Sequence, residues 1–507
     1  MATGWRERRN RYQILFKQLG TVRTNTVTHA MIYLLLILFP LAAAVGAFVL
    51  RRDSTLTGWL GVAVLASELW LALSVPINQP AQLLDLSINY NELGRLFLAT
   101  FSLSSLALAL LTTLVPQGEN FVAILLLIVG LSAAILIVQE PFVAAVVLLL
   151  ASLAGSLQLV DQPAGSAVLL RPQTLGMALK YTLLVALGGV LLLIGVVLAT
   201  AFSTQLARSG PTLTNAVFGL LLVGFGIRFG LIPFHWWLPD VLDETPPAAM
   251  FLHVGMLTIL ALPVLLVVLQ TQPQLLAGNA TGRHLILGLG GLSVLGGSAQ
   301  ALLTLQARRA IAGLAIANLG LLAIGMALST IAGIGAVLLG ALNHVFSMAL
   351  IALGLTLLER DVPGRREQAG ALRERSLAAL AFLVGILLLL GVPPLSGFTP
   401  RLLLIHAMQG QGVLVGSLVA AALVLSSLAG ARLIARMLLQ PRDMPTIRSL
   451  FSDDLDRLGM VAVPYAPWGV RILIVLLASF SLGLGLWPQP VVMELDDIAR
   501  AFPFLSR

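Results

Sequence analysis

The sequence predicts an all-α polytopic membrane protein with about fourteen transmembrane helices. Of its 507 residues, 58% are hydrophobic and 10% are charged, whereas soluble domains carry roughly 25% charged residues. Apolar runs follow one another along the chain, and most have the roughly 20 residues that a helix needs to cross a bilayer. These runs do not alternate between apolar and polar residues, so a transmembrane β-barrel is not expected.

The apolar runs divide the chain into five parts. The predicted helices span residues 29–50, 57–76, 94–115, 119–138, 141–160, 176–204, 212–237, 247–269, 284–304, 309–328, 331–357, 376–407, 411–437 and 469–488. The parts are a basic N-terminal tail at 1–28, three leading helices at 29–115, a first repeat at 119–270, a second repeat at 284–438, and a loop with a final helix at 439–507. No phosphate-binding glycine motif occurs, so ATP-driven transport by this chain alone is not expected.

Two of the predicted helices are interrupted by proline. The seventh contains Pro233 and the twelfth contains Pro393 and Pro394. A proline inside a helix removes a backbone hydrogen bond, and the freed groups are tolerated in a membrane only where protein or a water-filled cavity satisfies them. The two breaks fall in corresponding places of two five-helix groups, the fourth to eighth and the ninth to thirteenth helices. This layout predicts an inverted repeat of the kind found in transporters.

The charged residues indicate how the chain sits in the membrane. Lys and Arg number 30 against 22 Asp and Glu, and they lie mostly between apolar runs, so nucleic acid is not expected as a partner. The loops after helices 1, 5, 9, 11 and 13 are the more basic set, which predicts both termini on the outer side. The basic tail at 1–28 argues for the opposite orientation. The chain has no cysteine, which excludes disulfides, thiolate metal sites and iron–sulfur clusters.

Six ionisable residues inside or at the breaks of predicted helices are candidates for a proton path. They are Lys180, Arg228, His253, His344, Arg401 and Glu68. Such residues cost about 2.5–3.5 kcal/mol at the bilayer centre, so each needs a partner or a function. Lysine and histidine can carry protons, whereas arginine stays protonated and serves to bind or steer charge. No metal-binding motif occurs among them, so no metal site is expected.

Several of these residues also have a purely structural interpretation. Lys180 lies near the start of its helix, where a long side chain can extend to the interface. Glu68 could form a structural ion pair with an arginine such as Arg95. A lone histidine inside a membrane is often a hydrogen-bonded core residue, and this applies to His253 and His344.

Three motifs resemble those of one superfamily. Residues 233–241 (PFHWWLPDV), 245–249 (TPPAA) and 391–398 (GVPPLSGF) resemble motifs of the antiporter-like membrane subunits of respiratory complex I, chains L, M and N. Mrp antiporters and membrane-bound hydrogenases share these motifs. The form of residues 233–241, together with Leu179-Lys180-Tyr181, resembles chain N most. The resemblance covers roughly residues 94–438.

The resemblance implies fourteen helices in two inverted five-helix repeats, with broken seventh and twelfth helices and both termini on the outer side. It implies a multi-pass protein of the inner (plasma) membrane that moves protons, or Na⁺, within an NADH:quinone oxidoreductase translocase. Its partners would be other membrane-arm subunits and lipid, and no cofactor is expected in this chain. The alternatives are a cation/proton antiporter, a membrane-hydrogenase subunit, and a degenerate, non-pumping structural subunit.

The resemblance also assigns positions on the family's polar axis. Arg228 stands at the seventh-helix lysine, His253 at the eighth-helix histidine of chain L, Arg401 at the twelfth-helix lysine, and Lys180 at the sixth-helix lysine of chain N. The implied roles are a carrier for Lys180, a cation that biases it for Arg228, relays for the histidines including His344, and an outer gate for Arg401. The family's fifth-helix glutamate has no counterpart here, since its place falls near Leu149.

Overall fold

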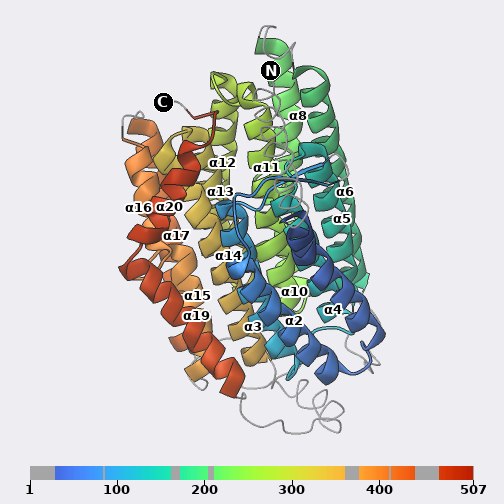
Figure 1. Ribbon diagram of the computed structural model, residues 1–507. Coiled ribbons are helices and arrows are strands. Elements are labelled where there is room, and N and C mark those ends of the chain that lie inside the picture. The colour runs from blue at the N-terminus through green and yellow to red at the C-terminus, as the bar shows by residue number, and fades with distance from the viewer. Residues whose placement is uncertain are drawn as a thin grey trace, which may run out of the picture.

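The structure is a computed structural model, and it describes residues 29–83, 86–161, 172–203, 211–359, 376–409, 413–439 and 468–505. Three basic segments that bear on the predicted orientation lie outside the described residues. They are the N-terminal tail at 1–28 and the arginine-rich loops at 360–375 and 440–467. The described helices pack side by side in one bundle. In Figure 1, α5 and α6 lie at one side of this bundle and α16, α17, α19 and α20 at the opposite side.

Helices dominate the described residues. They are a first helix (His29–Val49), α2 (Ser54–Ser74), α3 (Glu92–Thr112), α4 (Phe121–Ile137), α5 (Pro141–Gln158), α6 (Pro172–Ala201), α8 (Pro211–Phe229), α9 (Trp237–Glu244), α10 (Pro247–Met250), the π-helix η1 (Phe251–Leu257), α11 (Thr258–Thr271), the 3₁₀ turn η2 (Pro273–Leu275), α12 (Ala280–Leu303), α13 (Ala307–Leu328), α14 (Ile331–Glu359), α15 (Ser376–Leu390), α16 (Phe398–Ala407), α17 (Val413–Leu439), α19 (Trp468–Leu486) and α20 (Gln489–Arg500).

The prediction of about fourteen transmembrane helices is confirmed. Among the described residues, 12 helices are long and apolar enough to cross a membrane. The shorter apolar helices Phe121–Ile137 and Leu377–Leu390 occupy the two remaining predicted runs. Because each repeat contains five crossings, an odd number, the second repeat begins on the opposite side from the first and is inverted relative to it.

Both breaks lie where the prolines predict them. A turn separates α8 from α9, and another separates α15 from α16. Each turn opens with a glycine in the left-handed region, Gly230 with φ 61° and Gly391 with φ 70°, a conformation that glycine adopts without steric cost. The backbone N–H of Ile232 in the first turn donates to the Ser293 hydroxyl of α12 at 2.9 Å. A neighbouring helix thus satisfies a backbone N–H that the break leaves free.

Two elements were not predicted from the sequence. A short antiparallel hairpin, β1 (Ala81–Leu83) and β2 (Leu86–Ile88), joins α2 to α3. The amphipathic helix α20 follows the last span and packs against α14 and α3. Glu494 of α20 accepts a hydrogen bond from Arg95 of α3 at 2.9 Å, an ion pair that joins the end of the chain to its third span.

Arg308 holds the end of α9 against the start of α13. Its Nη1 donates to the backbone carbonyls of Leu242 at 2.8 Å and Thr245 at 2.6 Å. These carbonyls belong to the last turn of a helix and the residue after it, where backbone acceptors lack partners within the helix. A cation at this end also interacts favourably with the helix dipole.

We therefore expect Arg308→Ala to lower the free energy of unfolding by about 2 kcal/mol, the scale of hydrogen bonds made by a charged group. Thermal unfolding of the full chain in lipid nanodiscs measures the change. The control is Arg52→Ala, because Arg52 is exposed in the turn before α2. Replacement of an exposed surface residue usually changes stability by less than about 0.5 kcal/mol, and equal losses in both variants would contradict the capping role of Arg308.

Candidate functional site

The eighth span changes its winding where it meets the seventh-helix break. It begins as α10, continues as the π-helix η1 and proceeds as α11. Isolated π-helical turns occur frequently at functional sites, because the wider turn redirects side chains and carbonyls. The Thr258 hydroxyl donates to the carbonyl of His253 at 2.9 Å and so satisfies an acceptor within the wide turn.

His253 lies in the π-helical turn and is fully buried. Its Nδ1 is 2.8 Å from the Ala249 carbonyl oxygen, and its Nε2 is 3.0 Å from the Gly155 carbonyl oxygen of α5. Carbonyl oxygens only accept hydrogen bonds, and a neutral imidazole has a single N–H. Only the protonated ring, with two N–H donors, satisfies both contacts. The site therefore has the geometry to hold a proton on His253.

Arg228 is a second buried cationic group in this part of the bundle. It lies at the end of α8 with 3% of its surface exposed. Its guanidinium is hydrogen bonded to the Tyr181 side chain, and its Nη2 donates to the Leu257 carbonyl at 3.4 Å. The Tyr181 ring stands edge-on to the His253 ring, with 4.9 Å between centroids. Arg228, Tyr181 and His253 thus form one buried cluster in the first repeat.

His344 of α14 continues the polar contacts into the second repeat and is also fully buried. Its Nε2 is 3.1 Å from the Val254 carbonyl oxygen, so this nitrogen carries the hydrogen. Its Nδ1 is 3.0 Å from the Asn318 amide nitrogen of α13, and it accepts a hydrogen bond there. Neutral His344 is thus fully satisfied, unlike His253. His344 thus contacts the carbonyl of Val254, and Val254 is the next residue after His253 along the chain.

Arg401 lies at the far end of this series, in the first turn of α16. Its exposed fraction is 9%, and its Nη2 donates to the Leu389 carbonyl at 2.5 Å, an acceptor beside the twelfth-helix break. Its Nε and Nη1 have no partner among the described residues. Arg401 and Asn318 both line a cavity of about 20 Å³. A buried polar series therefore runs from Arg228 at one broken helix to Arg401 at the other.

Lys180 faces away from this series. Its Nζ lies 2.6 Å from Oδ2 of Asp240 and donates to the Trp236 carbonyl at 3.2 Å, and its side chain is 41% exposed. Successive residues of a helix point about 100° apart, so Lys180 turns away while Tyr181 points at Arg228. The structure gives Arg228 contacts with Tyr181 and Leu257, and it shows no contact between Lys180 and Arg228.

Glu68 is buried without a partner. Its residue is fully covered, and neither carboxylate oxygen has a hydrogen-bond partner among the described residues. The alternative of a structural ion pair with Arg95 is wrong, because Arg95 pairs with Glu494. Glu494 lies 399 positions from Arg95 along the chain, so no local sequence pattern predicts the pair.

Sequence reasoning missed three polar residues at this site. Tyr181, Asn318 and Asp240 contact Arg228, His344 and Lys180 respectively. Asn318 is a lone amide in a long apolar run. The rule used for ionisable residues would have found it, had the rule included amides.

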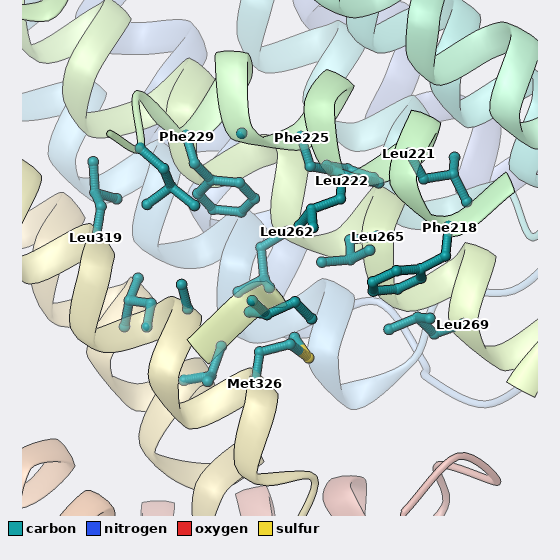
Figure 2. Close-up of a pocket in the computed structure, with 16 residues that line it drawn as sticks. Phe218, Leu221, Leu222, Phe225, Phe229, Leu262, Leu265, Leu269, Leu319 and Met326 are labelled. Carbon is teal, nitrogen blue, oxygen red and sulfur yellow. The ribbon is translucent and has the colours of Figure 1, made fainter. Parts of the chain in front are cut away.

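A second cavity, of about 50 Å³, lies between α8, α11 and α13. Figure 2 shows its wall, which includes Phe218, Phe225, Leu265 and Met326. All of the lining residues are apolar or glycine. Apolar cavities of this kind hold no ordered water, so this cavity does not provide a route for protons between the two repeats.

Known proteins share this architecture. The sequence profile of the family described as NADH:quinone oxidoreductase/Mrp antiporter, transmembrane, matches residues 170–428. NADH-quinone oxidoreductase subunit 14 of Thermus thermophilus is 34% identical over 231 residues, which are 45% of this chain and 51% of that protein. Hydrogenase-4 component B of Escherichia coli is 32% identical over 204 residues, 37% of this chain and 30% of that protein. The matched stretch spans about half the length of the NADH-quinone oxidoreductase relatives.

Solved structures match over nearly the whole chain. A chain of respiratory complex I from Thermus thermophilus with bound aureothin has a TM-score of 0.71 at 25% identity, covering 92% of this chain and 99% of that one. A chain of the Mrp complex from Dietzia sp. DQ12-45-1b has a TM-score of 0.79 at 20% identity, covering 93% and 97%, a likeness of fold. Since the family profile spans slightly more than half of the 507 residues, the chain belongs to the NADH:quinone oxidoreductase/Mrp antiporter transmembrane family.

Proposed function

We propose that this chain is a proton-translocating membrane-arm subunit of a complex I-like NADH:quinone oxidoreductase, nearest to chain N. Quinone reduction elsewhere in the complex would drive proton movement through it. The observation that carries the proposal is the buried polar series from Arg228 to Arg401, which joins the two broken helices across the repeats. Similarity to subunit 14 and to subunits N of NADH-quinone oxidoreductases supports the choice of complex.

His253 is the proton-holding residue of the proposed mechanism. Two carbonyls accept hydrogen bonds from its protonated ring. Burial of the ring and the positive charge of Arg228 in the same cluster oppose that form. A small displacement of Arg228 relative to His253 would therefore load or release a proton. A change in the charge of His253 would alter the hydrogen bond that His344 donates to the carbonyl of the next residue, Val254. Lys180 with Asp240 would supply protons at the surface. Glu68, a buried carboxyl without a hydrogen-bond partner among the described residues, would be a further member of the path.

The setting of the chain is part of the proposal. It would lie in the inner (plasma) membrane with both termini on the outer side, in contact with lipid and with other membrane-arm subunits, and it would hold no cofactor itself. The broadly apolar exposed surface of the first and last spans, with Met31, Val45 and Ile472 more than half exposed, suits lipid or a neighbouring subunit. Among the described residues, no group of His, Asp and Glu is arranged to hold a metal ion.

Replacement of Lys180 tests the proposed role in proton supply. We expect Lys180→Ala to lower the number of protons moved per electron in the assembled complex and to leave assembly unchanged. Asp240→Asn should have the same effect, because it removes the partner that positions the Lys180 amine 2.6 Å away. Proton uptake is measured in proteoliposomes during NADH oxidation. The exposed Arg52 in the turn before α2 supplies the control, Arg52→Ala. An unchanged ratio in Lys180→Ala would remove Lys180 from the path.

A second candidate function is a subunit of a membrane-bound hydrogenase, favoured by the 32% identity to hydrogenase-4 component B. Purification of the native complex separates the two functions. Co-purifying flavin and iron–sulfur chains with NADH oxidation support complex I, whereas a nickel–iron chain supports a hydrogenase. Sodium-dependent proton flux without NADH would instead indicate an antiporter.

The absent fifth-helix glutamate favours a non-pumping subunit as a third candidate. Leu149 occupies that region and packs against Gly189 of α6. In a non-pumping subunit, replacing Arg228 and His253 would lower stability and leave the proton-to-electron ratio unchanged. The same proteoliposome measurement therefore decides between this candidate and the proton-translocating one.

A further inference from the structure

Arg401 carries a buried positive charge that the described residues do not neutralise. Its residue is 9% exposed, and two of its three guanidinium nitrogens, Nε and Nη1, have no hydrogen-bond partner among them. The third, Nη2, donates to a neutral backbone carbonyl, that of Leu389. A buried charge without a counter-charge is costly. A lysine could lose its proton under these conditions, but an arginine stays charged.

The unpaired guanidinium lies at a small cavity whose wall is partly polar. The cavity measures about 20 Å³ and lies between α13, α14 and α16. Its polar lining includes the side-chain amides of Asn318 and Asn343, and no described residue that lines it is acidic. A site for one water molecule needs about 10–15 Å³. The cavity therefore has room for one water molecule or one monatomic ion, and a carboxylate or phosphate group is too large for it.

The first turn of α16 adds to the positive potential at this cavity. Gly397, the N-cap residue of α16, and Pro400 both line the cavity. No side chain caps this helix. Few N–H groups are open at this helix start, because the N–H of Phe398 donates to the Leu395 carbonyl at 3.0 Å and Pro400 has no N–H. The contribution of this end is the positive pole of the helix dipole, which attracts anions.

The amides of Asn318 and Asn343 already donate to His344 and to the Leu388 carbonyl. The fixed guanidinium and the positive end of the helix dipole favour negative charge at the cavity, and no described residue of the lining supplies any.

We propose that this cavity binds a halide ion, chloride under cellular conditions, as the counter-ion of Arg401. A single water molecule would satisfy N–H groups but would leave the charge uncompensated, which is the reason that an anion is favoured over water. Binding would neutralise the charge at one end of the buried polar series and so set the potential at Asn318 and His344. Anion binding requires no proton movement, so this inference goes beyond the proposed function and can fail or hold independently of it.

Halide-dependent stability of the full chain in lipid nanodiscs tests the site. Thermal unfolding is compared in sodium gluconate, chloride and bromide at constant ionic strength, because gluconate is too large for the cavity. A ligand that binds only the folded state raises the midpoint by mass action, and we expect a rise on the order of 2 °C in chloride and bromide. Bromide also gives an anomalous diffraction signal, which should lie beside Arg401.

Three variants separate a specific site from a general salt effect. Arg401→Gln removes the charge and should abolish the difference between halide and gluconate. Ala336→Leu fills the cavity from α14 while Arg401 is kept, so it should abolish the difference even if Arg401→Gln does not fold. Arg228→Gln removes another buried arginine that does not line the cavity, and it should retain the difference. Equal stability of the unsubstituted chain in all three salts, or a water molecule without bromide at the cavity, would overturn the proposal.

Discussion

Gly297→Ala should lower the free energy of unfolding by about 3 kcal/mol, because it forces two helices apart. A Cβ at Gly297 of α12 would lie 2.6 Å from the Gly313 carbonyl oxygen and 2.7 Å from the Ala317 nitrogen of α13. Both atoms belong to the backbone, so no side-chain rotation relieves the overlap. Small residues at helix interfaces in membranes permit this close approach.

The same close contact between the helices recurs two helical turns away, so the two helices cannot easily move apart at Gly297 alone. A Cβ at Gly290 of α12 would lie 2.9 Å from the Gly320 carbonyl oxygen of α13. The glycines are spaced by seven residues on both helices, and residues at that spacing share one helix face. The antiparallel pair α12–α13 is thus held at backbone contact along its length, and a shift at Gly297 disturbs both contacts.

Gly288 provides the matched control on the same helix. A Cβ there would meet nothing within 4 Å. Alanine in an open helical position is favoured over glycine by about 1 kcal/mol, so Gly288→Ala should be neutral or stabilising. Thermal unfolding and the yield of folded protein in nanodiscs measure both variants. If the two substitutions changed stability in the same direction and by similar amounts, close packing of α12 on α13 would not be the cause.

His253→Gln should reduce proton translocation through this chain at least about a hundredfold, the lower end of the range for positioned acid–base groups, while the chain stays folded. The glutamine amide has two N–H donors and can still donate to the carbonyls of Ala249 and Gly155, which the histidine ring contacts at 2.8 and 3.0 Å. We therefore expect stability within about 1 kcal/mol of the unsubstituted chain. The amide is not a titratable group at neutral pH, so the proposed proton-holding step is lost.

Proton uptake per NADH oxidised in proteoliposomes of the assembled complex measures this effect. His406→Gln is the control, because His406 lies exposed near the end of α16. Unchanged proton uptake in His253→Gln, with normal assembly, would place the proton path away from the eighth span. A loss of assembly would instead show that His253 acts through structure, and nanodisc stability of the single chain would identify that case.

The main features of the fold follow from the sequence because they depend on local chemistry. Crossing a membrane requires a helix of apolar residues, since backbone groups must be satisfied within the segment. The breaks follow from Pro233 and Pro393, which cannot donate a backbone hydrogen bond. Each repeat has five crossings, an odd number, so the second repeat begins on the opposite side of the membrane and is inverted. The hairpin β1–β2 and helix α20 were not predicted, because both lie outside the apolar runs.

The site was predicted as a set of residues and not as a set of contacts. Arg228, His253, His344 and Arg401 stood out because ionisable groups are rare within apolar helices. A helix that is apolar all round shows no preferred face in its sequence. The sequence therefore did not show in which direction each of these side chains points. It also did not show that Lys180 faces away from the buried polar series.

The sequence alone determined the number of crossings, the two breaks and the scarce ionisable residues, because each depends on short-range backbone and solvation energies. Only the tertiary structure decided the partners. It placed His253 between two carbonyls, paired Arg95 with Glu494 in place of Glu68, and put Arg401 at a small, partly polar cavity. Hydrogen bonds and ion pairs between helices depend on which faces meet, and that is set by packing of the whole bundle, including the glycine contacts of α12 with α13.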